Sequence, residues 1–354
     1  MALTNSKKGQ AFDKSSYKEL LTLKNLPSWL ALACLAVFAY IPNRLRDIFA
    51  IVCAYLVFLI PSKPRRVAYA NLRTAFPDLS AKECRAISRR SIAVGFCVTL
   101  AYGEPTFLPS FMLKRRWIVH GLEHLQKARE EGRPIIFLAP HTYAIDRCGL
   151  YLSYVGLEMC TMVRSQKNKV FDWFLNQQRL RFGGSVYERD AGLRTLIREL
   201  KSNHSCFFLP DEDLGDKSAR FIDFMGVPKA TVSTLPKLAK VGNAQVMQLF
   251  STYNIKKAAF EIFLSPVFEN YPGSDLDQDL RRMNECIEHE LVRHKEQYMW
   301  ILRIFKTLPD PSYPDIYANT YTSLYKSGKS IDVAGRRRPY RPYDEQGQEN
   351  NDSL

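Results

Sequence analysis

Hydrophobic positions follow three different patterns along this chain. Near the N-terminus, Leu26–Ile41 and Ile48–Ile60 are almost uninterrupted apolar runs, separated by the polar segment 43–47. From Trp117 onward, short apolar runs alternate with amphipathic stretches, and beyond Pro309 the chain becomes rich in Pro, Tyr and Asp. We therefore expect an N-terminal tail (1–25), a membrane anchor or hairpin (26–61), a main domain (62–308) and a C-terminal extension (309–354), disordered from about residue 327.

The alternating middle region predicts an α/β fold, in which helices flank a sheet and functional loops lie at the strand ends. Ahead of it, Ser80-Ala81-Lys82-Glu83 has the form of a capping box and predicts a helix that runs to about Tyr102. Further helices are expected over Val170–Phe182 and Leu193–Leu200. The expected strands are Trp117–Val119, Ile135–Leu138, Cys160–Val163, Cys206–Leu209, Ala244–Phe250 and Ala259–Leu264.

Each N-terminal apolar run is shorter than the roughly 20 residues that a straight transmembrane helix needs. Lysines precede the first run, basic residues follow the second at 63–66, and Arg44 and Arg46 lie between them. Positive charge at both outer ends favours a shallow hairpin or an interfacial insertion with both ends in the cytoplasm. A single span and two buried core helices are the alternatives.

Composition narrows the cellular setting. The eight cysteines are scattered without a Cys-x-x-Cys pair, which is typical of a reducing compartment and argues against a zinc ribbon or a secreted scaffold. The formal net charge of +14 favours polyanionic partners, such as nucleic acid, an anionic membrane, phosphorylated lipids or an acidic carrier protein.

The candidate chemistry lies directly after the apolar run Ile135–Leu138, where His141 and Asp146 are five positions apart. On one straight helix these side chains would point apart, because five residues turn through about 500°. Pro140 instead predicts an extended strand end, with His141 in a strand-to-helix turn and Asp146 folding back toward it from the first helical turn. A carboxylate against one imidazole nitrogen would leave the other free to act as a general base. A plain helix cap or a surface pair is the structural alternative.

Two pairs of histidines have spacings close to those of metal sites, but neither pair fits one. His289 and His294 are five apart, whereas a zinc-protease helix places its histidines four apart, and the extra residue turns the second ring about 100° away. His120 and His124 are four apart, but Gly121 between them predicts a strand-to-helix turn. We expect no catalytic metal.

Six further blocks follow the His-x4-Asp motif in a regular order. They are Arg164-Ser165-Gln166-Lys167-Asn168, Val170-Phe171-Asp172, Arg181-Phe182-Gly183-Gly184, Leu209-Pro210-Asp211-Glu212-Asp213-Leu214-Gly215, Arg281-Arg282-Met283-Asn284-Glu285 and Glu296-Gln297-Tyr298-Met299-Trp300-Ile301. From about Leu26 to Lys306 the chain resembles the late (secondary) acyltransferases of lipid A synthesis in Gram-negative bacteria. It is most similar to the myristoyltransferase branch, which adds the last acyl chain.

This resemblance implies a glycerolipid-acyltransferase-like fold with a mixed sheet flanked by helices. It also implies transfer of an acyl chain from acyl carrier protein to a hydroxyl on an acyl chain of a lipid A precursor. The enzyme would work at the cytoplasmic face of the inner membrane, contact its lipids, bind no nucleic acid and need no cofactor, since acyl carrier protein brings the co-substrate.

The resemblance also assigns residues. His141 and Asp146 inherit the catalytic dyad, and the expected substrate-binding residues are Arg164, Arg179, Arg181, Arg189, Asp211 and Asp213. Phosphates on lipid A give a reason for several arginines near the site. The structural alternatives are a surface ion pair for Arg164, a solvated face for Arg179 and Arg181, and a helix cap or turn for the two aspartates.

Two departures from the broader family accompany these assignments. Asp211 falls where glycerolipid acyltransferases have Glu, which indicates a site for a disaccharide lipid rather than glycerol phosphate. Gln248 stands where relatives often have Pro before the last apolar pair of a strand, so the path of the chain there is open.

The chemistry is consistent without the family. A secondary alcohol has a pKa far above 7, so its attack on a thioester needs a base in contact, whereas the activated donor needs no Ser or Cys nucleophile. We read Cys148 as a packing residue, and expect Lys114, Arg115, Arg116, Lys167 and Lys169 to attract the acidic carrier protein. The rival functions are a phospholipid acyltransferase with the same dyad and a basic membrane-bound scaffold for anionic lipid or nucleic acid.

Overall fold

The computed structural model of the chain describes residues 12, 14–215, 219–310 and 315–317. The segment from residue 327 that we expected to be disordered lies outside these residues, as do the first lysines of the N-terminal tail.

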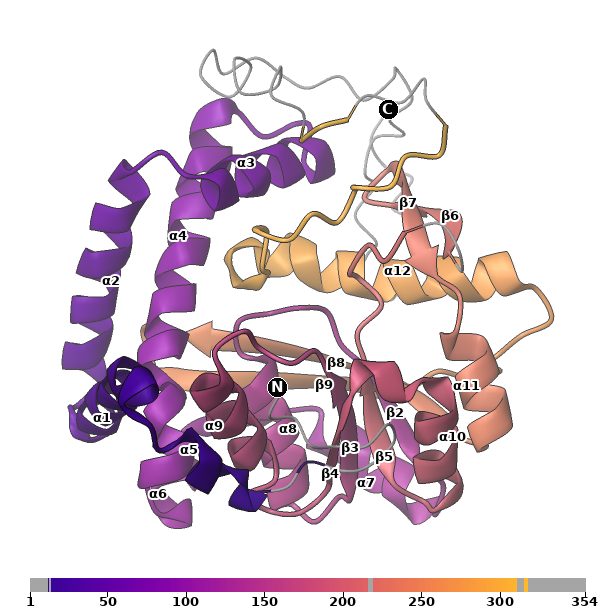
Figure 1. Cartoon of the computed structure of the whole chain (residues 1–354). Coiled ribbons are helices and arrows are strands. Elements are labelled where there is room, and N and C mark those ends of the chain that lie inside the picture. The colour runs from indigo at the N-terminus through magenta and orange to yellow at the C-terminus, as the bar shows by residue number, and fades with distance from the viewer. Residues whose placement is uncertain (1–11, 13, 216–218, 311–314, 318–354) are drawn as a thin grey trace.

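A seven-stranded mixed sheet forms the centre of the molecule (Figure 1). Its spatial order is β1-β9-β8-β2-β5-β3-β4. Every neighbouring pair is parallel except the antiparallel pair β8 and β9. The strands are β1 (Trp117–His120), β2 (Ile135–Leu138), β3 (Met159–Val163), β4 (Ser185–Glu188), β5 (Ser205–Phe208), β8 (Gln245–Asn254) and β9 (Ala259–Val267). The predicted α/β fold with a mixed sheet is confirmed.

Both faces of this sheet are buried, as the apolar run of β2 requires. Ile136 and Leu138 face a core shared with α3, α10, α11 and α12, whereas Ile135 and Phe137 face a core shared with α4, α7 and α8. The covering helices are α3 (Lys63–Ala75), α4 (Ala81–Leu100), α7 (Leu122–Glu130), α8 (Ile145–Tyr154), α9 (Lys169–Arg179), α10 (Leu193–Lys201), α11 (Leu235–Gly242) and α12 (Leu276–Arg293). Short helices α5 (Glu104–Phe107) and α6 (Ser110–Lys114) follow α4.

Local signals placed most of these elements correctly. Ser80 and Glu83 form the predicted capping box at the start of α4, and Gly121 makes the predicted turn between β1 and α7 with φ = 76°. The pattern missed β4, which has only one apolar pair between polar ends, and the antiparallel hairpin of β6 (Ala219–Phe224) and β7 (Val227–Val232) above α12 (Figure 1).

Gln248 occupies an irregularity in the pairing of β8 with β9, where the register shifts between Met247 and Leu249. Its backbone N–H donates to Ser265 Oγ at 3.0 Å instead of to a strand carbonyl, and its side chain donates to Cys286 O at 2.5 Å. The position therefore lies at a β-bulge, where a residue without an N–H is also tolerated.

The N-terminal apolar runs form α1 (Leu26–Tyr40) and α2 (Asn43–Leu59), which pack against α4, α5 and the turn Ala101–Gly103 at one side of the molecule. Among the described residues, the helical segment Leu23–Tyr40 is long and apolar enough, by length and composition, to cross a membrane. Each helix buries only one side, so the alternative of two fully buried core helices is wrong.

The polar segment between the two runs is not a loop, because α2 begins at Asn43 and the chain breaks at Ile41 and Pro42. Arg46 is fully buried and its Nη1 lies 2.5 Å from Glu104 Oε1. The expectation that Arg46 lies in a basic turn between the two runs is therefore wrong, because the residue belongs to α2 and pairs in the core with a carboxylate 58 positions away along the chain.

Candidate active site

His141 lies in the loop that joins the carboxyl end of β2 to α8, as the position of Pro140 predicted. The segment Gln297–Met299 braces this loop. The backbone N–H of Met299 donates to His141 O at 3.0 Å, that of Tyr143 donates to Gln297 O at 3.3 Å, and Thr142 forms a β-bridge with Tyr298. The block around Tyr298 thus fixes the backbone on which the histidine stands.

The carboxylate that contacts the His141 ring belongs to Asp211, which follows β5 at the same edge of the sheet. Asp211 Oδ1 lies 2.7 Å from His141 Nδ1, and Asp211 Oδ2 accepts the backbone N–H of His141 at 2.7 Å. Tyr298 Oη donates to the same Oδ2 at 2.8 Å. Parallel strands β2 and β5 are neighbours, so the loops after them meet although 70 positions separate the residues.

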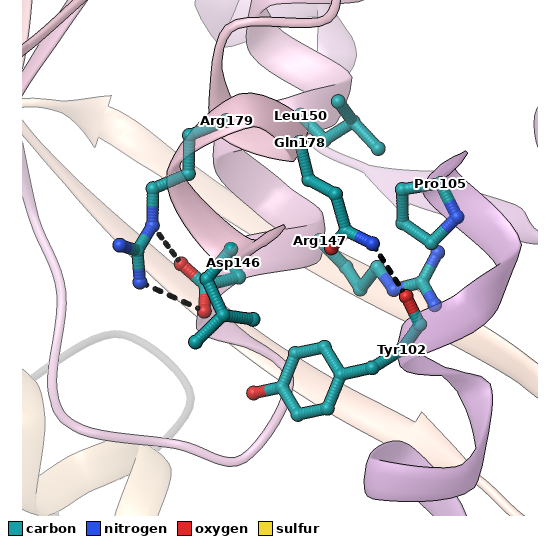
Figure 2. Close-up of a pocket in the computed structure, with 8 residues that line it drawn as sticks. Tyr102, Pro105, Asp146, Arg147, Leu150, Gln178 and Arg179 are labelled. Atoms are coloured by element: carbon teal, nitrogen blue, oxygen red, sulfur yellow. Dashed lines mark hydrogen bonds and ion pairs between the residues drawn. The ribbon is translucent and has the colours of Figure 1, made fainter. Parts of the chain in front are cut away.

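Asp146 occupies the first turn of α8, as expected, but its side chain turns toward α9 and not toward His141. Both of its oxygens accept hydrogen bonds from Arg179, at 2.8 Å from Nε and 3.2 Å from Nη2 (Figure 2). The predicted contact between Asp146 and the imidazole is therefore wrong. Arg179 of the neighbouring helix α9 occupies this carboxylate instead, because its planar guanidinium matches both oxygens.

Electrostatics at His141 follow from the Asp211 contact. Burial alone would lower the pKa of His141, but the charge and hydrogen bond of Asp211 outweigh burial and raise the pKa above its ordinary value. Burial would likewise raise the pKa of Asp211, but His141 and Tyr298 hold it below its ordinary value. The aspartate is therefore ionised at neutral pH.

A buried lysine also interacts with Asp211. Lys229 of β7 is 1% exposed, and burial lowers its pKa to about 8 despite the charges of Asp211 and Asp213. The amine therefore supports both carboxylates electrostatically.

A cavity of about 570 Å³ opens beside His141 and extends along β3 between α8, α9 and α10. Its rim carries polar groups, including His141, Asp146, Arg164, Arg179, Arg189 and Glu212. Its interior is mostly apolar, with Leu150, Met159, Met162, Leu175, Val186, Leu196, Phe207 and Phe208 among its lining residues. A long apolar group with a polar head fits this arrangement.

Three of the predicted arginines lie at the cavity rim. Arg164 is exposed at the end of β3, and Arg179 is held by Asp146 and by Asn176 Oδ1 at 2.7 Å. Arg189 pairs with Glu212 at 3.1 Å, and both side chains are about 40% exposed. The loops after β3, β4 and β5 thus bring these groups to the same edge as His141.

Two residues that we predicted to bind substrate instead form hydrogen bonds that hold parts of the chain together. Arg181 donates to the backbone oxygens of Pro105 in α5 and of Leu108 directly after it, so it ties the segment that follows α9 to α5. Asp213 accepts from the backbone N–H and the hydroxyl of Thr307, each at 2.6 Å, and from the N–H of Gly215. The turn interpretation of Asp213 is confirmed.

Sequence reasoning missed two members of the site. Tyr298 lies inside the block Glu296–Ile301, for which the motif assigned no role to the tyrosine, although a tyrosine among apolar residues is a candidate donor to a buried carboxylate. Lys229 had no local signal, because it lies on a hairpin that the apolar pattern did not reveal.

The arrangement supports proton transfer. Asp211 accepts from Nδ1, which leaves Nε2 with the lone pair, and within the described ranges no side chain or backbone group bonds to Nε2. A hydroxyl at the cavity mouth would meet an oriented base whenever the imidazole is neutral.

The sequence of this chain matches a known protein family and several of its members. The family model described as bacterial lipid A biosynthesis acyltransferase matches residues 14–307, which include every residue of the cavity. A lipid A biosynthesis acyltransferase of Haemophilus influenzae is 33% identical over 282 residues, covering 80% of this chain and 88% of the relative. The lipid A biosynthesis myristoyltransferase of Escherichia coli K12 is 31% identical over 280 residues, 79% and 87% of the two chains. The lauroyltransferase of that organism is 24% identical over 293 residues, 80% and 92%.

Proposed function

Because the chain belongs to the bacterial lipid A biosynthesis acyltransferase family, we propose that it moves a fatty acyl chain from acyl carrier protein to a hydroxyl on an acyl chain of a lipid A precursor. The family and enzyme class predicted from the motifs are confirmed by the match over residues 14–307. The donor, the acceptor hydroxyl and the acting residues are proposed here. The observation that supports them most is His141, held by Asp211 at the mouth of an apolar cavity.

In the proposed reaction His141 is the general base. Its Nε2 takes the proton of the acceptor hydroxyl while that oxygen attacks the carbonyl carbon of the thioester. The new C–O bond forms, the C–S bond of the tetrahedral intermediate breaks, and the leaving thiolate receives the proton from the imidazolium. A carboxylate against Nδ1 stabilises the imidazolium between the two proton transfers.

The two ends of the cavity suit the two ends of such substrates. Its apolar interior along β3 suits an acyl chain, because burial of apolar surface is favourable by about 25 cal/mol of free energy per Å². Its rim offers Arg164, Arg179 and Arg189, whose guanidinium groups match phosphate oxygens of a lipid A precursor.

Acyl carrier protein is proposed as the donor because the chain carries a net charge of +14 and such carriers are acidic. Lys114, Arg115, Lys167 and Lys169 remain candidate contacts. Arg116 does not, because it is 6% exposed and its Nη2 lies 3.0 Å from Glu104.

The surfaces of α1 and α2 support our proposal for the position of the enzyme. Their inner faces pack on the catalytic domain, while their outer faces expose Leu26, Leu30, Val37, Ile48, Phe49, Val52, Leu56 and Leu59. We place these faces in the cytoplasmic leaflet of the inner membrane, with residues 62–308 on the cytoplasmic side. A cysteine at position 8 that gains labelling from an impermeant reagent in intact spheroplasts, above the unaltered chain, would contradict this topology.

Addition of the last acyl chain is the branch we propose. The myristoyltransferase is 31% identical to this chain, against 29% for the palmitoleoyltransferase and 24% for the lauroyltransferase of the same organism. The acceptor would then already carry one secondary chain.

The test is reconstitution with purified full-length protein in detergent. We expect mass spectrometry to detect one added acyl chain on a lipid A precursor supplied with acyl-acyl carrier protein, and no addition with His141→Ala. A matched assay offers lysophosphatidic acid as acceptor. Acylation of that lipid without acylation of the precursor would overturn the proposal, and precursors with and without a secondary chain decide the branch.

A further inference from the structure

Two carboxylates lie at the same edge of the sheet as His141, and each already has a partner. The geometry points to a division of labour that rests on the proposed function. We propose that Asp211 is the residue that positions His141 for acyl transfer, whereas Asp146 positions Arg179 at the substrate rim.

Asp211 holds its histidine at two points. One oxygen faces the ring nitrogen Nδ1 and the other accepts the backbone N–H of the same residue, so both the ring and the chain that carries it are fixed. Tyr298 in turn fixes the carboxylate through its hydroxyl. With its side chain fully buried, Asp211 makes these bonds without competition from water.

This contact also selects the tautomer. A carboxylate only accepts hydrogen bonds, so Nδ1 must carry the proton and Nε2 must present its lone pair to the cavity. An amide at position 211 has one accepting oxygen for the two N–H groups of His141. Asparagine would therefore either leave the backbone N–H unpaired or donate to Nδ1 and put the proton on Nε2, where it blocks the base.

Asp146 has a different geometry. Both of its oxygens are bound by Arg179 (Figure 2). Arg179 lies at the cavity rim and is further held by Asn176. Without this carboxylate the guanidinium would lose its fixed orientation toward the substrate. The expected consequence is weaker binding of the acceptor, not a change in the base.

The charged groups around the base make the two roles separable by pH. Burial lowers the pKa of His141, while Asp211 and, more weakly, Glu212 raise it and Arg189 lowers it. Asp211 itself interacts with the charge of Lys229 and accepts the hydroxyl of Tyr298. Removal of the charge at 211 leaves burial and Arg189 dominant, so the pKa of His141 should fall.

The experiment compares Asp211→Asn and Asp146→Asn in the full chain. For Asp211→Asn we expect kcat to fall about 10³-fold with little change in KM for the acceptor. For Asp146→Asn we expect mainly a rise in KM for the lipid A precursor. Thermal unfolding of each variant separates loss of fold from loss of function.

A second measurement does not depend on activity. Diethyl pyrocarbonate reacts with neutral imidazole, so the pH midpoint of His141 modification, followed by peptide mass spectrometry, reports its pKa. We expect the midpoint to shift to lower pH in Asp211→Asn and to stay in place in Asp146→Asn. Glu199→Gln is the matched control, because Glu199 forms a similar pair with His204, at 2.8 Å, outside the cavity.

The outcomes are distinguishable. If Asp146→Asn shifts the midpoint and lowers kcat while Asp211→Asn does neither, the assignment of the two carboxylates is overturned. If the unaltered protein transfers no acyl chain to a lipid A precursor, the proposed function fails instead, and the modification midpoints still decide which carboxylate holds His141.

Discussion

Two of the regions in which the described part of the chain buries ionised side chains differ in a way that separates structure from chemistry. The first region, here the anchor cluster, consists of Arg46, Glu104, Arg116 and Arg147. Glu104 lies within 2.5, 3.0 and 3.4 Å of the three guanidinium groups. The second is the His141 site. Both are enclosed, but only the second places a histidine at the large cavity along β3.

The anchor cluster joins four parts of the chain. Arg46 comes from α2, Glu104 from α5, Arg116 from the segment before β1 and Arg147 from α8. All four side chains are 7% exposed or less. Its charges are directed at one another, which is typical of a structural network, whereas the Asp211 carboxylate acts on a histidine whose other nitrogen remains open.

The largest expected effect separates the regions by activity. His141→Ala should lower kcat by up to about 10⁴-fold, because it removes the proposed general base for the acceptor hydroxyl. The side chain is 25% exposed, so the unfolding temperature should change little. Transfer assays and thermal unfolding of one preparation measure both. Normal turnover by this variant would remove His141 from the mechanism.

The converse variant is Glu104→Ala. It leaves three buried guanidinium groups without their shared carboxylate and should destabilise the fold by about 3–5 kcal/mol. Chemical denaturation measures the loss, while kcat per folded molecule should remain close to that of the unaltered protein. A stable Glu104→Ala protein would show that the cluster contributes nothing to the fold.

The two regions should also respond differently to pH. Below the raised pKa of His141 the base is protonated, so kcat/KM should fall about tenfold per pH unit, with a midpoint above about 6.5.

Glu104 behaves in the opposite sense. Burial alone would raise its pKa, but the three arginines hold it below its ordinary value. Its stabilising contribution is present above the unfolded pKa and is lost only as the pH falls through the lower folded pKa. Between pH 5.5 and 8, we therefore expect activity to change and the stability difference between Glu104→Ala and the parent to stay constant. A stability difference that follows the activity profile would contradict this separation.

Exposed charges form a third case. Salt screens interactions between exposed charges, whereas it screens the two buried regions much less. The double variant Lys167→Glu and Lys169→Glu should raise KM for the acyl carrier protein about tenfold at low ionic strength, and the difference should shrink with added salt. Steady-state kinetics at several salt concentrations test this, with Lys240→Glu on α11 as the control. Equal KM values for the double variant and the parent would exclude these lysines from docking.

The smallest effect is expected at an exposed ion pair. Arg133 and Glu131 lie 2.6 Å apart with both side chains more than 40% exposed, so Glu131→Gln should change stability by less than about 0.5 kcal/mol. Chemical denaturation alongside Glu104→Ala makes the comparison direct. A loss approaching that of Glu104→Ala would mean that burial does not decide the contribution of these pairs.

These two regions also show which features could be predicted from the sequence and which could not. Local signals identified β2, the turn at Pro140 and His141, because strand, turn and cap preferences act over a few residues. The partner of the histidine lies 70 positions away and that of Arg46 lies 58 positions away, so neither follows from spacing. Asp146 was assigned to His141 because it is near in sequence, yet the packing of α8 on α9 gave it Arg179.

Arg46 has a practical consequence for making a soluble enzyme. Truncation before residue 61 would remove the apolar helices, but it would also delete Arg46 and the buried side of α2, including Ala50 and Ala54. An inhibitor-screening protein is better obtained by keeping α2 and replacing its outward residues Ile48, Phe49, Val52 and Leu56 with polar ones. The membrane-facing surface can be redesigned, whereas the helix beneath it is part of the enzyme's interior.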